Sequence, residues 1–184
     1  MNAIHDRLTS RLADRRMASL ACMSFLAALG LGGCAETPAP SVQDATPAFY
    51  RALDRADARI DPVAARDMIS IYRTNNRQAA LTIDPALQAV AEAQAKAMAQ
   101  AGAPNANVKG ALRQRLAGAQ ISRAVAVENV SAGYHTLAEA FSGWRQSGPH
   151  NAVMLNPKAR RMGIATAYAA GSKYKVYWAL VLTD

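Results

Sequence analysis

ENVSAGYHTLAEAFSGWRQSGPHNAVML, residues 128–155, is the stretch that decides the fold of this chain. Glu128 opens it, an amphipathic helical pattern begins at Leu137, and His150 lies just past that helix. A carboxylate and an imidazole that are brought back together by a strand, a turn and a helix are typical of the walls of a polar site. We therefore expect Glu128 and His150 to line one cleft.

Two helices are predicted upstream, and each begins with an aspartate followed by a proline, at 61–62 and at 84–85. The aspartate side chain can cap the first turn, and proline already has the backbone angle that the first helical position needs. Gly102 is expected to end the second helix. Apolar residues at helical spacing define the buried faces, which are Ala65, Met68, Ile69 and Tyr72, and then Leu87, Ala91, Ala95 and Met98.

The rest of the pattern mixes helices and strands. A short helix is expected at 111–117, an alternating strand at 121–127, and a helix after the capping box Thr136-Leu137-Ala138-Glu139. Two further strands, at 162–168 and 174–182, are expected to form a hairpin. This order predicts an α+β fold, a three-layer α-β-α sandwich around a small mixed or antiparallel sheet.

The first 33 residues read as an export signal. Four arginines precede an uncharged apolar run at 17–31, which has the length of a signal-peptide core and is short for a membrane-spanning helix. The run ends in LGGC at 31–34, which resembles the bacterial lipobox, so Cys34 is predicted to be lipidated and to anchor the chain to a membrane. Ala35 favours the outer membrane over the inner one. A plain secretory signal with a chance cysteine is the alternative.

Residues 34–60 are predicted to be the lipidated cysteine with a flexible tether and arm, because their first part is small, polar and rich in proline. The folded domain is expected at 61–184. Cys22 leaves with the signal, so no disulfide is expected within this domain.

The chain has 184 residues and a net charge of +8. Loss of residues 1–33 removes four arginines and two aspartates and leaves about +6. This charge suits an anionic envelope partner such as a lipid headgroup or a cell-wall polymer, and it also serves solubility. Nucleic acid is not an expected partner, because the chain is exported and has no arginine-rich run or aromatic-basic stripe.

Segments distributed over 67–182 resemble, in order and spacing, the CAP superfamily (the SCP-like domain of cysteine-rich secretory, antigen-5 and pathogenesis-related-1 proteins) in its small bacterial form. The resemblance implies an α-β-α sandwich with a cleft lined by acidic and histidine side chains. The segments that carry it are ISIYRTNN, LTIDPAL, AEAQAKAMA, AVENVSAG, GWRQSGPHNAVML, MGIATAY and YKVYWALVL.

Carried over from the family, Glu128 and His150 match the cleft glutamate and the C-terminal cleft histidine. The other family histidine follows the second helix, where this chain has Ala106. No carboxylate matches the second glutamate of many eukaryotic members. Asn129 is expected to be a buried residue that holds the ENV turn, and Asn151 to border the cleft.

The depleted site shapes the expected chemistry. One histidine and one carboxylate seldom hold zinc or copper tightly, so no metal or other cofactor is expected, with Glu128 and His150 as the weak candidate ligands. Catalysis by these two residues on water is conceivable, but no oxyanion hole is evident, and Ser147 reads as a helix end rather than a nucleophile. In a purely structural role, Glu128 would accept backbone N–H bonds. His150 would cap a helix end or form a hydrogen bond that bridges to Glu128.

The sequence therefore favours a monomeric, lipid-anchored envelope module that binds a lipid or another envelope component through the Glu128–His150 cleft. One alternative is a weak hydrolase of an envelope polymer or peptide that uses the same two residues. The other is a structural lipoprotein whose cleft is vestigial.

Overall fold

The computed structural model describes residues 46–184. The predicted signal peptide, Cys34 and most of the tether lie outside these residues. In the described part no helix is long and apolar enough to cross a membrane. The elements are η1 (Ala48–Tyr50), α2 (Pro62–Asn75), β1 (Thr82–Ile83), α3 (Pro85–Ala101), α4 (Leu112–Gly118), β2 (Ala126–Ala132), α5 (Leu137–Gln146), α6 (Gly148–Met154), β3 (Arg161–Tyr168) and β4 (Val176–Thr183).

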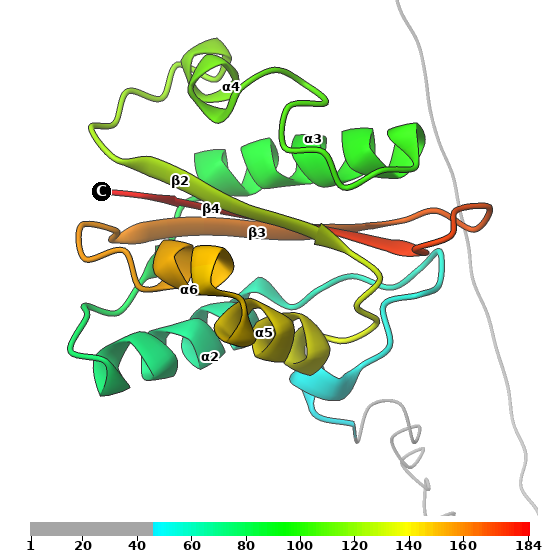
Figure 1. Ribbon diagram of the computed structural model, residues 1–184, viewed down its shortest axis with the longest axis horizontal. Helices are drawn as coiled ribbons and strands as arrows, with labels where there is room; N and C mark the ends of the chain where they lie inside the picture. Colours follow the sequence, from blue (N-terminus) through cyan, green and yellow to red (C-terminus); the bar gives the residue numbers. More distant parts are fainter. Residues whose placement is uncertain (1–45) are drawn as a thin grey trace, which may run out of the picture. The chain divides into compact units, whose positions relative to one another are not determined.

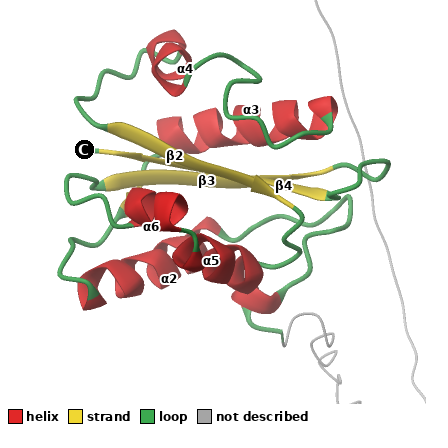
Figure 2. Cartoon of the chain, viewed as in Figure 1, coloured by secondary structure: helices red, strands yellow, loops and turns green. Residues whose placement is uncertain are grey.

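A four-stranded mixed sheet in the order β1-β3-β4-β2 forms the middle layer (Figure 1). β4 pairs antiparallel with both β2 and β3, whereas β1 pairs parallel with β3 over only two residues. α3 and α4 cover one face, and α2, α5 and α6 cover the other (Figure 2). The α-β-α sandwich predicted from the sequence is therefore confirmed.

The alternation of β4 divides the core into two layers. Trp178, Leu180 and Leu182 pack with the helices α2, α5 and α6. Tyr177, Ala179 and Val181 pack with α3 and α4. Since every residue of β4 is buried, this strand is the centre of the domain and carries apolar side chains on both faces.

Gly163 in β3 lets α3 approach the sheet closely. A Cβ atom at this position would lie 2.2 Å from the backbone carbonyl carbon of Leu87. A glycine is therefore required here by the packing of a helix against a strand rather than by a turn.

The predicted helix starts are confirmed. The Asp61 side chain accepts hydrogen bonds from two backbone N–H groups of α2, and Asp84 does the same for α3. Gly102, with a φ of 68°, ends α3 in the left-handed conformation that glycine adopts readily. These signals could be read from the sequence because each one acts within a single turn of the chain.

Two local predictions were wrong. The strand expected at 121–127 begins only at Ala126, because the Ile121 N–H remains bound to the Leu116 carbonyl at the end of α4. Residues 128–130 consequently lie inside β2 and do not form a turn. His150 lies past the helix α5, which ends at Gln146, as predicted, but it belongs to a second short helix, α6, whose first turn contains Pro149.

The described part of the predicted tether and arm packs against the domain. Leu53 is 4% exposed, and its N–H donates to the His135 carbonyl at 2.8 Å. Phe49 and Ile60 contact the same apolar layer. The arm therefore covers the end of the sheet next to α2 and α5.

Candidate functional site

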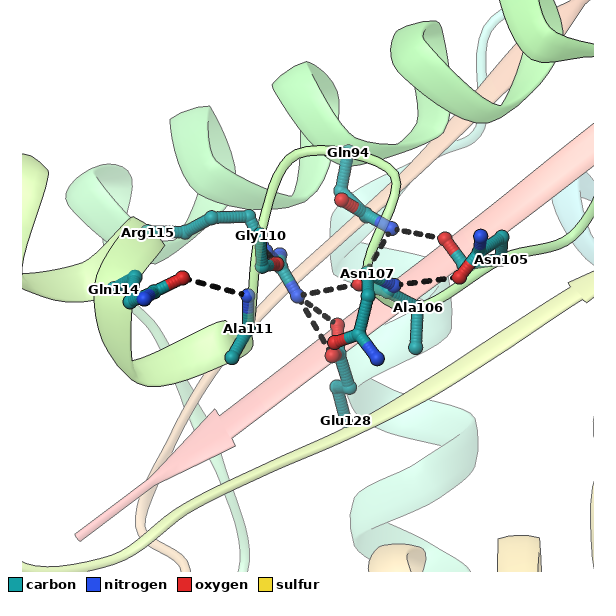
Figure 3. A network of polar contacts seen from close by, with 9 residues as sticks. All are labelled: Gln94, Asn105, Ala106, Asn107, Gly110, Ala111, Gln114, Arg115 and Glu128. Carbon is teal, nitrogen blue, oxygen red and sulfur yellow. Dashed lines mark hydrogen bonds and ion pairs between the residues drawn. The ribbon is translucent and has the colours of Figure 1, made fainter.

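Glu128 lies on the edge strand β2 and forms an ion pair with Arg115 of α4 (Figure 3). Arg115 Nη2 is 2.6 Å from each of the two carboxylate oxygens. Only 7% of the Arg115 side chain and 12% of the Glu128 side chain are exposed. The carboxylate is therefore neutralised by a guanidinium.

Arg115 also holds the loop that connects α3 to α4. Its Nε donates to the Gly110 carbonyl at 3.1 Å, and its Nη2 lies 3.4 Å from the Ala106 carbonyl. One side chain thus connects α4, this loop and β2. The sequence analysis did not identify Arg115. The signal available was that Glu128 has no family histidine as its partner, so that a nearby basic residue was needed to balance its charge.

Ala106 lies at the position that the family resemblance assigns to the absent histidine. Its carbonyl accepts from Arg115 and also from Gln94 Nε2, at 3.1 Å. Gln94 is a fully buried residue of α3 that donates to the Asn105 carbonyl as well, at 2.9 Å. The backbone of Ala106 therefore belongs to the same polar network as Glu128 (Figure 3).

This network contains two buried atoms that have no hydrogen-bond partner among residues 46–184. They are the acceptor Oε1 of Gln94 and the donor Nη1 of Arg115. Buried polar groups usually find a partner, and the protein atoms of the described part do not supply one for these two atoms.

Asn129 follows Glu128 in β2, and its side chain points to the opposite face because strand residues alternate. It is 1% exposed, and its Nδ2 donates to the His150 carbonyl at 3.0 Å. Asn129 is therefore the buried hydrogen-bonding residue that was predicted, although it holds α6 rather than a turn.

His150 and Asn151 belong to α6, which packs with α5. The Asn151 Oδ1 atom accepts from the Tyr72 hydroxyl at 2.9 Å, which fastens α6 to α2. Within the described residues, no hydrogen bond joins the imidazole of His150 to Glu128, so the predicted bridge between them is not formed. Arg115 connects Glu128 with the Ala106 carbonyl, whereas the backbone carbonyl of His150 is bound by the side chain of Asn129.

The chemistry open to this arrangement is limited. A general base must take up a proton, and protonation of Glu128 would break its ion pair with Arg115. Residues 46–184 contain no group of three or more histidine, cysteine, aspartate or glutamate side chains that could hold a metal ion.

Comparisons with known proteins agree with the fold. A model of the cysteine-rich secretory protein family, CAP, matches residues 66–182. No curated protein sequence matches the chain significantly. Among solved structures, an outer surface protein of Borrelia burgdorferi is similar with a TM-score of 0.61 and 17% identity, over 69% of this chain and 97% of that one.

Two longer proteins contain a similar domain. An extracellular protein with an SCP domain from Bacillus anthracis has 21% identity and a TM-score of 0.59, over 67% of this chain and 40% of that chain. A cysteine-rich secretory protein from Staphylococcus aureus has 16% identity and a TM-score of 0.55, over 66% and 37%. This chain therefore spans about two fifths of each, and the likeness concerns the fold alone.

Proposed function

The chain belongs to the cysteine-rich secretory protein (CAP) family, and from that premise we propose that it is an exported binding module of the cell envelope rather than a hydrolase. One observation carries this proposal, the Arg115–Glu128 ion pair at the place where the family resemblance leads one to expect histidine and glutamate. The guanidinium lies against both carboxylate oxygens of Glu128, which are the atoms that a general base would offer to water.

A groove of about 370 Å³ between α3 and α4 supports a binding role. Its lining consists largely of small apolar residues, with Lys109 beside them and Arg115, whose charge Glu128 balances. An apolar floor with a positive rim complements an acyl chain that ends in an anionic headgroup. We propose such an envelope lipid as the ligand, with Lys109 as the residue that meets its charge.

The N-terminal pattern supports attachment to a membrane. The apolar run at 17–31 and the LGGC segment at 31–34 fit export followed by lipidation of Cys34. Similar domains occur in proteins described as extracellular or as outer surface proteins, which agrees with export. We propose that lipidated Cys34 holds a monomeric domain at the periplasmic side of the outer membrane.

The test compares binding with hydrolysis on the full chain carrying Cys34→Ser. Native mass spectra are recorded with short-chain phosphatidylglycerol and with phosphatidylcholine, and digests of peptidoglycan fragments are analysed in parallel. We expect the phosphatidylglycerol adduct to dominate, to weaken in Lys109→Glu and to persist in the matched control Lys158→Glu. No new peptidoglycan product is expected.

Two results would overturn the proposal. A peptidoglycan product that disappears in Glu128→Gln or His150→Ala would establish the hydrolase. Spectra without any lipid adduct, together with unchanged peptidoglycan, would favour the structural lipoprotein with a vestigial cleft.

A further inference from the structure

The outer edge of β3 has a backbone partner over only part of its length. β1 pairs with Arg161 and Met162 and then ends. Two residues later the side chain of Gln88 takes the place of a strand. Its Oε1 accepts from the Ile164 N–H at 3.0 Å and its Nε2 donates to the Ile164 carbonyl at 2.7 Å.

Beyond Ile164 the edge is open. In an antiparallel pair, every second residue directs its N–H and C=O away from the partner strand. Since Ile164 directs both groups away from β4, Thr166 and Tyr168 do so as well. In residues 46–184 these outward backbone groups have no hydrogen-bond partner. Such an edge is a template for another strand.

A groove of about 530 Å³ runs along this open edge. The arm before α2 forms one wall through Ala56 and Ile60, together with Pro62 at the start of α2, and α3 forms the other wall. Figure 1 shows the arm and α3 on opposite sides of the sheet. A strand added to β3 would therefore direct alternate side chains toward an apolar wall and toward α3.

The charged residues that line the groove determine which side chains an added strand should carry. Gln88, Glu92 and Lys96 follow one another at intervals of four residues, which places them on one face of α3. Glu92 lies 3.3 Å from the Gln88 amide, and Lys96 is exposed. Arg59 lines the groove as a second cation, so the groove carries a net positive charge.

We propose that this groove binds an extended, acidic segment of a partner protein, which adds to β3 as a further strand at Thr166 and Tyr168. The unpaired N–H and C=O groups of Thr166 and Tyr168 favour a polypeptide as the ligand, because an acyl chain would leave them without hydrogen bonds. The excess of cations calls for acidic side chains. This site shares no lining residue with the groove between α3 and α4, so the inference does not depend on lipid binding.

The test uses the full chain with Cys34→Ser, labelled with ¹⁵N, and synthetic peptides of about seven residues, the length of a typical strand. One peptide alternates valine with aspartate, a second alternates valine with serine, and a third alternates valine with lysine. Amide chemical shifts and hydrogen exchange are followed during each titration. We expect the acidic peptide to shift and protect the amides of Thr166 and Tyr168.

Three variants separate the contribution of the groove charge from that of the backbone hydrogen bonds. Lys96→Glu should weaken the acidic peptide about fivefold and improve the lysine peptide. Lys158→Glu makes the same charge change outside the groove and should leave binding unchanged. Thr166→Pro removes one outward N–H, which an edge position tolerates, and should abolish protection at Tyr168.

The inference is overturned if none of the peptides moves these two amides in the folded chain. It is also overturned if Lys96→Glu and Lys158→Glu weaken binding equally, since the groove would then not be the site. Shifts of the same amides that depend on protein concentration without peptide would identify a second copy of this chain as the occupant and would likewise reject an acidic partner.

Discussion

The two faces of the sheet each contain a buried arginine, and the two arginines are satisfied in different ways. Arg73 of α2 is fully buried and donates only to backbone carbonyls, whereas Arg115 of α4 pairs with the carboxylate of Glu128. The carbonyls that accept from Arg73 belong to Ala79, Met154, Asn156 and Ala159, at distances of 2.6 to 3.1 Å.

This difference distinguishes a structural arginine from one in a modifiable site. The Met154 carbonyl lies at the end of α6, where the helix carries partial negative charge that favours a cation. Burial lowers the pKa of the Arg73 guanidinium below its usual value, and the charge of Arg160 lowers it further. Carbonyls alone nevertheless hold Arg73. Arg115, in contrast, has one buried nitrogen without a hydrogen-bond partner among residues 46–184.

The largest effect is expected for Arg73→Met. The substitution removes the donors of four carbonyls, and each unsatisfied buried group costs about 1–3 kcal/mol. We expect the free energy of unfolding to fall by about 4 kcal/mol or more, as measured by urea denaturation followed by circular dichroism. Arg66→Met, on the exposed face of the same helix, should change it by less than about 0.5 kcal/mol. Equal losses would contradict the structural role of Arg73.

Arg115→Met should cost less, about 2–3 kcal/mol, because Glu128 loses its cation but keeps slight contact with water. The double variant Arg115→Met/Glu128→Met should recover much of this loss, since it leaves no buried charge without a partner. The same denaturation experiment yields the coupling energy. If the two losses simply add, the ion pair contributes nothing, and the contrast with Arg73 disappears.

Local signals were readable in the sequence, and long-range contacts were not. The aspartate caps at 61 and 84 act within one turn, so their helices could be predicted from neighbouring residues alone. Arg115 looks like an ordinary cation on a short helix, because its partner Glu128 lies on a separate strand. Its role becomes visible only when the loop after α3 brings α4 beside β2.

The candidate site was predicted in part for the same reason. Glu128 and Ala106 were chosen from the family resemblance, and the structure places both in one polar network around Arg115. The expected cleft of Glu128 and His150 rested on a strand, a turn and a helix that bring the chain back, and on the family resemblance. Strand alternation instead directs Asn129 toward α6 and Glu128 toward α4, and a motif does not reveal which of two neighbouring residues points to which face.

His150→Ala offers a smaller test of the same division. The imidazole is partly exposed and has no hydrogen bond to Glu128, so we expect a change in unfolding free energy within about 0.5 kcal/mol. Asn129→Ala should cost about 1–2 kcal/mol, because it leaves the buried side of the His150 carbonyl without its donor. A larger loss for His150→Ala than for Asn129→Ala would mean that the imidazole, and not the Asn129 hydrogen bond, holds α6.

A further ionic contact, between Asp54 and His135, lies at the surface. Of the three interactions compared, we expect it to contribute least to stability. His135 Nδ1 is 3.0 Å from the Asp54 carboxylate, and the side chains are 45% and 40% exposed. The hydrogen bond from His135 is the main cause that lowers the pKa of Asp54 below 3.8. Because the folded pKa is the lower one, this contact stabilises the protein above the unfolded pKa, and the stabilisation is lost as pH falls through the folded value.

His135→Ala should therefore return the pKa of Asp54 toward 3.8 and change stability at neutral pH by only a few tenths of a kcal/mol, about the value of an exposed pair. Carbonyl ¹³C shifts of the aspartates, titrated with acid, measure this change. Asp184 is the internal control, because a backbone hydrogen bond from Val125 lowers its pKa and does not involve His135. If Asp54 does not move, or if Asp184 moves with it, the contact with His135 is not the cause of the lowered pKa of Asp54.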